Sequence, residues 1–477
     1  MLAGAAFSTG ELALDEASTF FVAVRPLQEV LTLPITFHAQ PPLYYVALHE
    51  WLRVGDSEPW LRLLSLLFML CAAATLLGAS WLSPATRVIT LGILLLSNYG
   101  LFLDGFIRPY ALAVWLSLWS CLLFCAVLIE RNRSIRVYAA YIVVTASMAY
   151  SLAMASWLLL AQGVCVLVAI GLAWKRGGAA EARRQHARLV VALAIVGLAY
   201  LPYVVAVSRL HARLGHPSLG ASLGAALNPR YYVSGPLYLL AMPFRLGTVA
   251  AALAAYAAWT GLQRRDAPVG VLLLIVAIQI AMTHGFLEGR SPFAFRYLAP
   301  AYPAACLLAG IGAARWLDTT RRARQVVAAC AACLLAAAGV AAARGPQQAS
   351  GGVWRHVRED LASFSGTKVV FFEIGWDAQP LQYEARHDPD VRVMANPGPG
   401  WATGGQNMTP EYVSGVIARE ARSPVTFFYH VDPLARGAAF EAAFVPAMAR
   451  RGCARVYERA LQHDGGAVLH GYACHGG

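Results

Sequence analysis

The stretch YALAVWLSLWSCLLFCAVLI, from Tyr110 to Ile129, contains no charged residue. About 20 such residues in a helix cross the hydrocarbon core of a bilayer, which is about 30 Å thick. Long apolar runs of the same kind recur from Trp60 to Ala343. The sequence therefore predicts a polytopic α-helical membrane protein with about ten spans. We expect them near residues 60–83, 86–103, 110–129, 137–150, 152–174, 188–208, 246–262, 267–287, 297–316 and 325–343.

The composition excludes an ordinary soluble enzyme. Of 477 residues, 58% are hydrophobic and 13% are charged, and the mean hydropathy is +0.53. Soluble domains are typically about 45–50% apolar and about 25% charged. The net charge of +12 comes from residues 1–344, because the remaining residues hold 12 basic and 13 acidic side chains. Arginines that orient helices in a membrane explain this charge, so no nucleic-acid partner is predicted.

The positive-inside rule gives one consistent threading of the chain. Basic residues cluster at 131–136, 175–188, 264–265 and 315–324. If these loops are cytoplasmic, the segments outside are 1–59, 104–109, 209–245, 288–296 and the tail after Arg344. We expect a multi-pass protein of the inner (cytoplasmic) membrane with an extracytoplasmic C-terminal domain.

The tail changes character and predicts a small α/β domain, because strand-like and helix-like segments alternate. The predicted strands are 368–374, 425–430, 453–461 and 467–474, and the predicted helices are 353–364, 410–422 and 438–451. The chain thus divides into a first external segment (1–59), a transmembrane domain (60–344) and an external α/β domain (345–477).

Two of the nine cysteines, Cys453 and Cys474, fall in this external domain, on two strands that we expect to be adjacent. A disulfide would form there in an oxidising periplasm. Two free thiols are the alternative, and the sequence leaves both open.

Acidic residues are concentrated in the first external segment, where Asp15 and Glu16 precede an apolar helix at 17–24. Ionisable groups beside a membrane carry a cost and need a reason. One interpretation is that Asp15 caps this helix, and composition alone favours it. The other is that the pair performs chemistry.

Two further external turns bring charge to the same side of the membrane. The second turn carries Asp104 and Arg108, and the third carries Arg290, Arg296 and Tyr297. An arginine at a helix end can simply reach the lipid headgroups. Taken together, the acids and arginines indicate a cleft for an anionic, phosphorylated ligand, since arginine binds phosphate well.

Several short motifs resemble a known family. They are the Asp-Glu pair at 15–16, Pro-Pro-Leu-Tyr-Tyr at 41–45, Trp-Leu-Arg-Leu-Leu-Ser at 60–65, Arg-Pro-Tyr-Ala-Leu at 108–112 and Arg-Tyr-Leu-Ala-Pro at 296–300. In this order, over about residues 11–316, they resemble bacterial glycosyltransferases of the GT-C superfamily. The branch they look like is the one that contains protein-mannosyltransferase-like and aminoarabinose-transferase-like enzymes.

The resemblance implies a sugar donor linked to polyprenyl phosphate and an envelope acceptor (lipid, polysaccharide or protein) on the outer face of the membrane. Asp15 would be the general base of an inverting transfer, and Glu16 would orient it or the acceptor. Arg108 and Arg296 would neutralise the lipid phosphate as it leaves. Further candidates for substrate binding are Asp104, His38, Tyr44 and Tyr45, although packing under the loop is an equal alternative for the two tyrosines.

The sequence departs from the family pattern at three places. Gln40 stands where relatives usually have histidine, and His38 lies two residues earlier. Phe106 stands where many relatives have an acid. The family begins with a transmembrane helix ahead of the catalytic acid, and only 14 residues precede Asp15 here. No cofactor or metal is predicted, because no cluster has suitable ligand spacing.

Two other functions fit a membrane protein of this kind. A transporter or flippase for a lipid-linked glycan would show internal repeats and broken polar helices at mid-membrane. The predicted spans are largely apolar and the acids lie in loops, which favours the enzyme. A catalytically inactive scaffold relative is the third alternative.

Overall fold

The computed structural model describes residues 12–130, 134–214, 246–287, 294–319, 353–372, 378–395, 410–420, 425–431, 438–461 and 467–474, with five single residues between 232 and 240. They form two compact units. The membrane unit holds the described residues from 34 to 319. The tail unit holds residues 12–33 together with those from 353 to 474.

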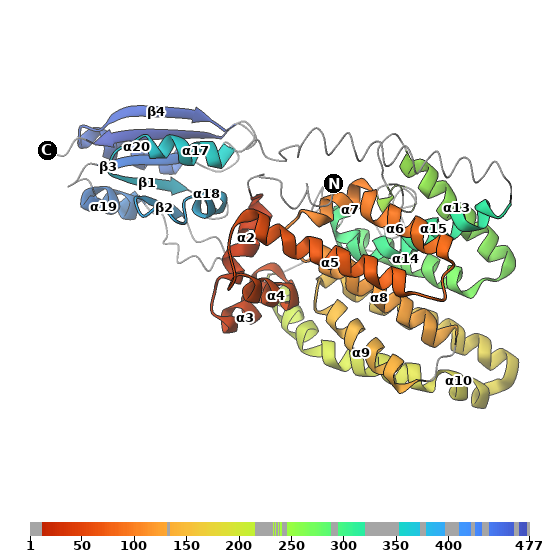
Figure 1. Cartoon of the computed structure of the whole chain (residues 1–477). Helices are drawn as coiled ribbons and strands as arrows, with labels where there is room; N and C mark the ends of the chain where they lie inside the picture. The colour runs from red at the N-terminus through yellow and green to blue at the C-terminus, as the bar shows by residue number, and fades with distance from the viewer. Residues whose placement is uncertain are drawn as a thin grey trace. The chain divides into compact units, whose positions relative to one another are not determined.

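The membrane unit is entirely helical in the part described (Figure 1). Its helices are α4 (Leu43–Trp51), α5 (Glu58–Gly78), α6 (Pro84–Leu96), α7 (Asn98–Asp104), α8 (Tyr110–Leu128), α9 (Ile135–Ala149), η1 (Ala153–Ala155), α10 (Ser156–Leu214), α13 (Leu246–Arg264), α14 (Ala267–Leu287), η3 (Ala294–Ala301) and α15 (Tyr302–Leu317). Helix α3 (Leu27–His38) crosses the division between the units.

The hydropathy of the sequence predicted the positions of these helices. In lipid a chain must satisfy its backbone polar groups internally, so the segments that cross the membrane form helices. In the described part, five helical stretches are long and apolar enough to cross a membrane. Two shorter apolar helices, α6 and α9, coincide with further predicted spans. The polytopic helical fold is confirmed, and the predicted span at 325–343 lies outside the described residues.

Two predicted spans are joined differently from the expectation. The basic segment 175–188 was predicted as a loop, but it continues the helix on both sides as part of α10. One residue interrupts it: Gly178 has φ 73° and ψ −174°. Glycine reaches this left-handed region without steric cost. Helix α10 therefore consists of two arms that meet at Gly178.

Close helix packing depends on two glycines of α15. A Cβ at Gly312 would overlap the carbonyl oxygen of Leu253 on α13, and one at Gly310 would overlap the hydroxyl of Thr90 on α6. Small residues let helix backbones approach in a membrane, where packing replaces the hydrophobic driving force. These contacts hold α15 between α6 and α13.

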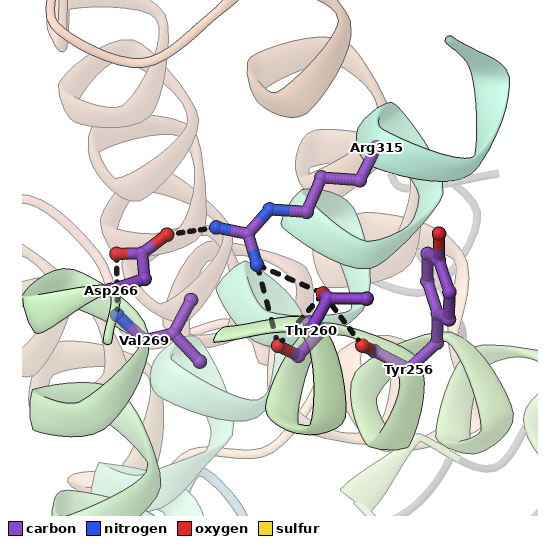
Figure 2. A network of polar contacts seen from close by, with 6 residues as sticks. Tyr256, Thr260, Asp266, Val269 and Arg315 are labelled. Atoms are coloured by element: carbon purple, nitrogen blue, oxygen red, sulfur yellow. Dashed lines mark hydrogen bonds and ion pairs between the residues drawn. The ribbon is translucent and has the colours of Figure 1, made fainter. Parts of the chain in front are cut away.

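A polar clamp ties the turn between α13 and α14 to the end of α15 (Figure 2). Arg315 forms an ion pair with Asp266 and donates a hydrogen bond of 3.1 Å to the hydroxyl of Thr260. The other oxygen of Asp266 accepts from the backbone N–H of Val269 at 3.4 Å. Asp266 therefore caps α14 while it neutralises Arg315. One arginine of the predicted cytoplasmic cluster thus serves helix packing.

The tail unit contains a five-stranded sheet in the order β2-β1-β3-β5-β4 (Figure 1). Strands β1, β2 and β3 are parallel, whereas β5 is antiparallel to both β3 and β4. The strands are β1 (Thr367–Phe372), β2 (Val391–Ala395), β3 (Val425–Val431), β4 (Ala454–Ala460) and β5 (Val468–Cys474). Strands β2 and β4 are the two edges.

Helices cover both faces of this sheet. The core on one face joins β1 and β3 to α19 (Pro410–Glu420) and α20 (Ala438–Arg450). The core on the other face joins them to α17 (Val353–Ala362) and α18 (Gln379–Glu384). The predicted α/β domain is confirmed. The sequence missed α18 and β2, which are short and contain polar residues.

The two cysteines of the tail unit form a disulfide. Cys453 precedes β4 and Cys474 ends β5, and their Cα atoms are 4.2 Å apart. The bond closes the antiparallel pair β4–β5 at one end.

Candidate functional site

The turn that carries Arg108 is held by side chains of α5. Arg62 donates to the carbonyl oxygen of Gly105, and the hydroxyl of Ser65 donates to that of Phe106 at 2.8 Å. Both residues belong to the Trp-Leu-Arg-Leu-Leu-Ser motif. Since they bind backbone carbonyls, the motif fixes the path of the chain into Arg108.

Arg108 itself is largely buried, with 6% of its surface exposed. Its backbone N–H donates to the carbonyl of Phe106 at 2.8 Å, and Pro109 follows as the N-cap of α8. A buried guanidinium is stable only where anions or carbonyl oxygens surround it. The fold therefore holds a cation in place between α7 and α8.

The segment that carries Arg296 lies in η3, directly before α15. The guanidinium of Arg296 donates to the hydroxyl of Tyr297 at 3.2 Å and lies 5.1 Å from the centre of that ring. The hydroxyl of Tyr99, on α7, donates to the backbone carbonyl of Arg296 at 3.0 Å. Both ends of Arg296 are thus fixed by tyrosines.

Aromatic contacts bring these two arginine-bearing segments together. Phe106 stacks on Tyr110 at 6.1 Å between ring centres, and Tyr110 meets Tyr297 edge-on at 6.3 Å. Residues almost 190 positions apart in the sequence therefore belong to one cluster. The segments that carry Arg108 and Arg296 therefore lie near each other.

A cavity of about 970 Å³ reaches this cluster. Both arms of α10 line it, and most of its walls are apolar. Tyr297 and Gln40 are among its polar lining residues. An apolar space of this size with a few polar groups is typical of a ligand site.

The corner before α4 is tied to the start of α10. The amide oxygen of Gln40 accepts from the backbone N–H of Ala153 at 3.3 Å, and the hydroxyl of Tyr203 donates to the carbonyl of Ala39 at 2.6 Å. Ala39 has a φ of 48°, so the chain bends sharply here. Gln40, noted in the sequence as a departure from the family pattern, thus shapes one wall of the cavity.

Tyr44 and Tyr45 are completely buried on α4. The ring of Tyr44 lies 6.2 Å from that of Tyr45 and 6.5 Å from that of Phe68 on α5. Neither tyrosine lines the cavity. Their described contacts are those of a packed core beneath the Pro-Pro corner.

The predicted catalytic pair lies in the tail unit, on α2 (Leu14–Ala23). The expectation that Asp15 caps this helix is wrong, because the N-cap is Ala13. The carboxylate of Glu16, three residues later, reaches back and accepts from the backbone N–H of Ala13 at 2.9 Å. This is the acidic half of a capping box. Glu16 therefore satisfies a backbone N–H at the start of α2, and the partly buried Asp15 is not the N-cap residue.

The remaining candidates divide as follows. The side chains of His38 and Asp104, at the ends of α3 and α7, lie outside the described part of the structure. Among the residues that are described, no group of three or more His, Cys, Asp or Glu side chains could hold a metal. Asp15 belongs to one unit, and Arg108 and Arg296 belong to the other.

Sequence reasoning missed the roles of three residues, Ser65, Tyr99 and Tyr297. Ser65 and Tyr297 stand inside quoted motifs, but only the fold shows what they contact. Tyr99 carried no signal beyond its place next to the second turn.

The fold of this chain is similar to those of two solved membrane proteins, ArnT and AglB. ArnT from Cupriavidus metallidurans in the apo state is similar over 98% of this chain and 95% of its own, with 14% identity and a TM-score of 0.60. ArnT from the same organism bound to undecaprenyl phosphate is similar over 98% and 96%, with 14% identity and a TM-score of 0.56.

The archaeal oligosaccharyltransferase AglB from Archaeoglobus fulgidus, in complex with an inhibitory peptide and a dolichol-phosphate, is also similar. It matches over 98% of this chain and 71% of its own, with 12% identity and a TM-score of 0.50. No protein-family model and no curated protein matches the sequence. The resemblance drawn from the five short motifs is confirmed at the level of the fold.

Proposed function

We propose that this protein is an inverting glycosyltransferase. It moves a sugar from a polyprenyl-phosphate donor to an envelope acceptor on the outer face of the cytoplasmic membrane. The observation that carries the proposal is the mostly apolar cavity lined by both arms of α10 and by Tyr297, whose ring contacts Arg296. A long hydrocarbon chain with a phosphate at one end has the matching chemistry.

The chemistry of the leaving group supports the arginines as its binding residues. When the bond between the anomeric carbon and the lipid phosphate breaks, negative charge develops on the phosphate oxygens. Fixed guanidinium groups stabilise such charge without reorganising, and they form charge-assisted hydrogen bonds with phosphate. The backbone of both arginines is held by hydrogen bonds, at the N–H of Arg108 and at the carbonyl of Arg296. The guanidinium of Arg296 also donates to the hydroxyl of Tyr297.

Asp15 is proposed as the general base. It would accept the proton of the acceptor hydroxyl as the oxygen attacks the anomeric carbon, which inverts the configuration at that carbon. The capping role of Glu16 supports this assignment, because Asp15 is not the residue that satisfies the start of α2. ArnT bound to undecaprenyl phosphate and AglB in complex with a dolichol-phosphate have a similar fold.

The test is sugar transfer in proteoliposomes that contain a polyprenyl-phosphate sugar and an envelope lipid extract. Asp15→Asn should lower the turnover by about 10²–10⁴-fold, the usual contribution of a general base. The matched control is Glu50→Gln, an exposed acid paired with Arg53 in the same external segment. Arg296→Ala should instead weaken binding of polyprenyl phosphate, measured by native mass spectrometry.

Two outcomes would contradict the proposal. If Asp15→Asn has wild-type turnover, Asp15 is not the general base. Absence of any transfer, together with movement of lipid-linked glycan across the liposome membrane, would identify a flippase instead.

A further inference from the structure

The helix that carries Asp15 depends on the tail unit for its stability. Helix α2 has ten residues, and an isolated helix of this length is marginal in water. Most of its residues after Asp15 are buried. Helix α2 belongs to the same compact unit as the α/β domain. Within this unit, α2 packs against α18 (Figure 1).

One aromatic pair forms the centre of this contact. The ring of Phe20, on α2, meets the ring of Tyr383, on α18, with 4.9 Å between the ring centres and 85° between the planes. Phe20 is 4% exposed and Tyr383 is 1% exposed. This edge-to-face geometry is the one that aromatic pairs prefer. It makes the pair a directional contact.

Tyr383 is itself immobilised on the domain side. The guanidinium of Arg386 lies 3.8 Å from the centre of its ring and donates to its backbone carbonyl at 2.7 Å. The next residue of α18, Glu384, forms an ion pair with Arg355 of α17, with 3.8 Å between the carboxylate oxygen and the guanidinium nitrogen. These contacts hold α18 in place, and α2 packs against it.

Asp15 precedes Phe20 by five residues, about 7.5 Å along a helix. The hydroxyl of Thr19 donates to the backbone carbonyl of Asp15 at 2.8 Å, which adds to the rigidity of this turn. Because Asp15 and Phe20 belong to one continuous helix, a rotation of that helix at Phe20 displaces the carboxylate of Asp15. A misplacement of about 1 Å in a catalytic group can cost about 10²-fold in rate.

We propose that Tyr383 is a positioning residue for the transfer reaction, acting through Phe20 to set the orientation of the helix that carries Asp15. The α/β domain then contributes to turnover directly, as the support of the base, in addition to any contact with an acceptor. This inference rests on the proposed role of Asp15.

The experiment compares turnover and donor binding in the full-length protein in proteoliposomes. Tyr383→Ala and Phe20→Ala should each lower kcat at least tenfold and leave the Kd for polyprenyl phosphate unchanged. Tyr383→Phe retains the ring and should retain kcat. The double variant should be no worse than either single variant, because both remove the same contact.

The structural control is Phe444→Ala on α20, on the opposite face of the same sheet, where the ring contacts Phe371 and Tyr429. It should destabilise the domain, measured by limited proteolysis, yet leave kcat within twofold. If Phe444→Ala lowers kcat as much as Tyr383→Ala, the contact acts only through domain stability and the inference is overturned.

Failure of the inference is distinguishable from failure of the proposed function. Wild-type kcat in Tyr383→Ala, together with loss of transfer in Asp15→Asn, overturns the positioning role and leaves the transferase intact. Retained transfer in Asp15→Asn overturns the function itself.

Discussion

The hydroxyl of Ser65 donates a hydrogen bond of 2.8 Å to the carbonyl of Phe106, two residues before Arg108. The bond joins α5 to the turn before α8, 41 residues later. It turns a short sequence motif into a support for the guanidinium that is proposed to bind phosphate.

Ser65→Ala should weaken the binding of polyprenyl phosphate about fivefold, since a hydrogen bond of this kind contributes about 1 kcal/mol. Native mass spectrometry of lipid-bound protein measures the change. Ser117→Ala is the control, because Ser117 on α8 is equally buried and its hydroxyl has no hydrogen-bond partner among the described residues. If Ser65→Ala leaves the Kd for polyprenyl phosphate unchanged, the hydrogen bond to this turn does not contribute to phosphate binding.

Gly312→Ala should destabilise the membrane unit by about 1–3 kcal/mol, the usual cost of overpacking. The added methyl group would overlap the carbonyl of Leu253 and push α13 away from α15. Thermal unfolding in detergent measures the loss. Gly92→Ala on α6, where a Cβ meets nothing within 4 Å, should be neutral or slightly stabilising because alanine favours a helix. Equal melting temperatures for the two variants would contradict the packing role.

The pair Arg315 and Asp266 should show a coupling energy of about 1–3 kcal/mol in a double-mutant cycle. The two side chains are 18% and 23% exposed, so a charge left without its partner is only partly hydrated. Arg315→Ala and Asp266→Ala should each lower the unfolding temperature, and the double variant should lower it by less than the sum. Strict additivity would mean that the ion pair does not stabilise the turn between α13 and α14.

Loss of the disulfide should cost the tail unit about 3 kcal/mol, since the bond closes a loop between cysteines 21 residues apart. Cys453→Ser should therefore increase proteolysis of the domain.

The disulfide also allows a test of the side of the membrane on which the tail unit lies. Cells with a permeabilised outer membrane and an intact inner membrane are treated with a membrane-impermeant reductant and then with a membrane-impermeant maleimide. Both cysteines should be labelled. Labelling only after the inner membrane is broken would place the tail on the cytoplasmic side.

The helices were predictable because lipid enforces them, whereas their connections depended on particular residues. The segment around Arg176 and Arg183 is basic and was expected to be a loop. Arginine is nevertheless a good helix former, and one glycine, Gly178, was sufficient for the bend. The short β2 and α18 lacked a clear periodicity, so only the completed sheet identifies them.

The sequence singled out the candidate residues because charge beside a membrane is costly and therefore noticeable. It did not predict their arrangement. The sequence could not distinguish which acid of the first turn caps α2, since Asp15 and Glu16 are adjacent and only the backbone shows that Glu16 stands three residues after the N-cap. The contact between Tyr110 and Tyr297 likewise depends on the path of the chain between them.

Among the described strands, β4 forms one edge of the tail sheet, and sheet edges can pair with strands of neighbouring molecules. Here the edge carries Arg455, Glu458 and Arg459, whose charges are paired with each other or with Asp360. The opposite edge, β2, carries Arg392, which is paired with Glu420. Because charged side chains along an edge oppose the approach of a second strand, we expect these two edges to disfavour pairing between the sheets of neighbouring copies.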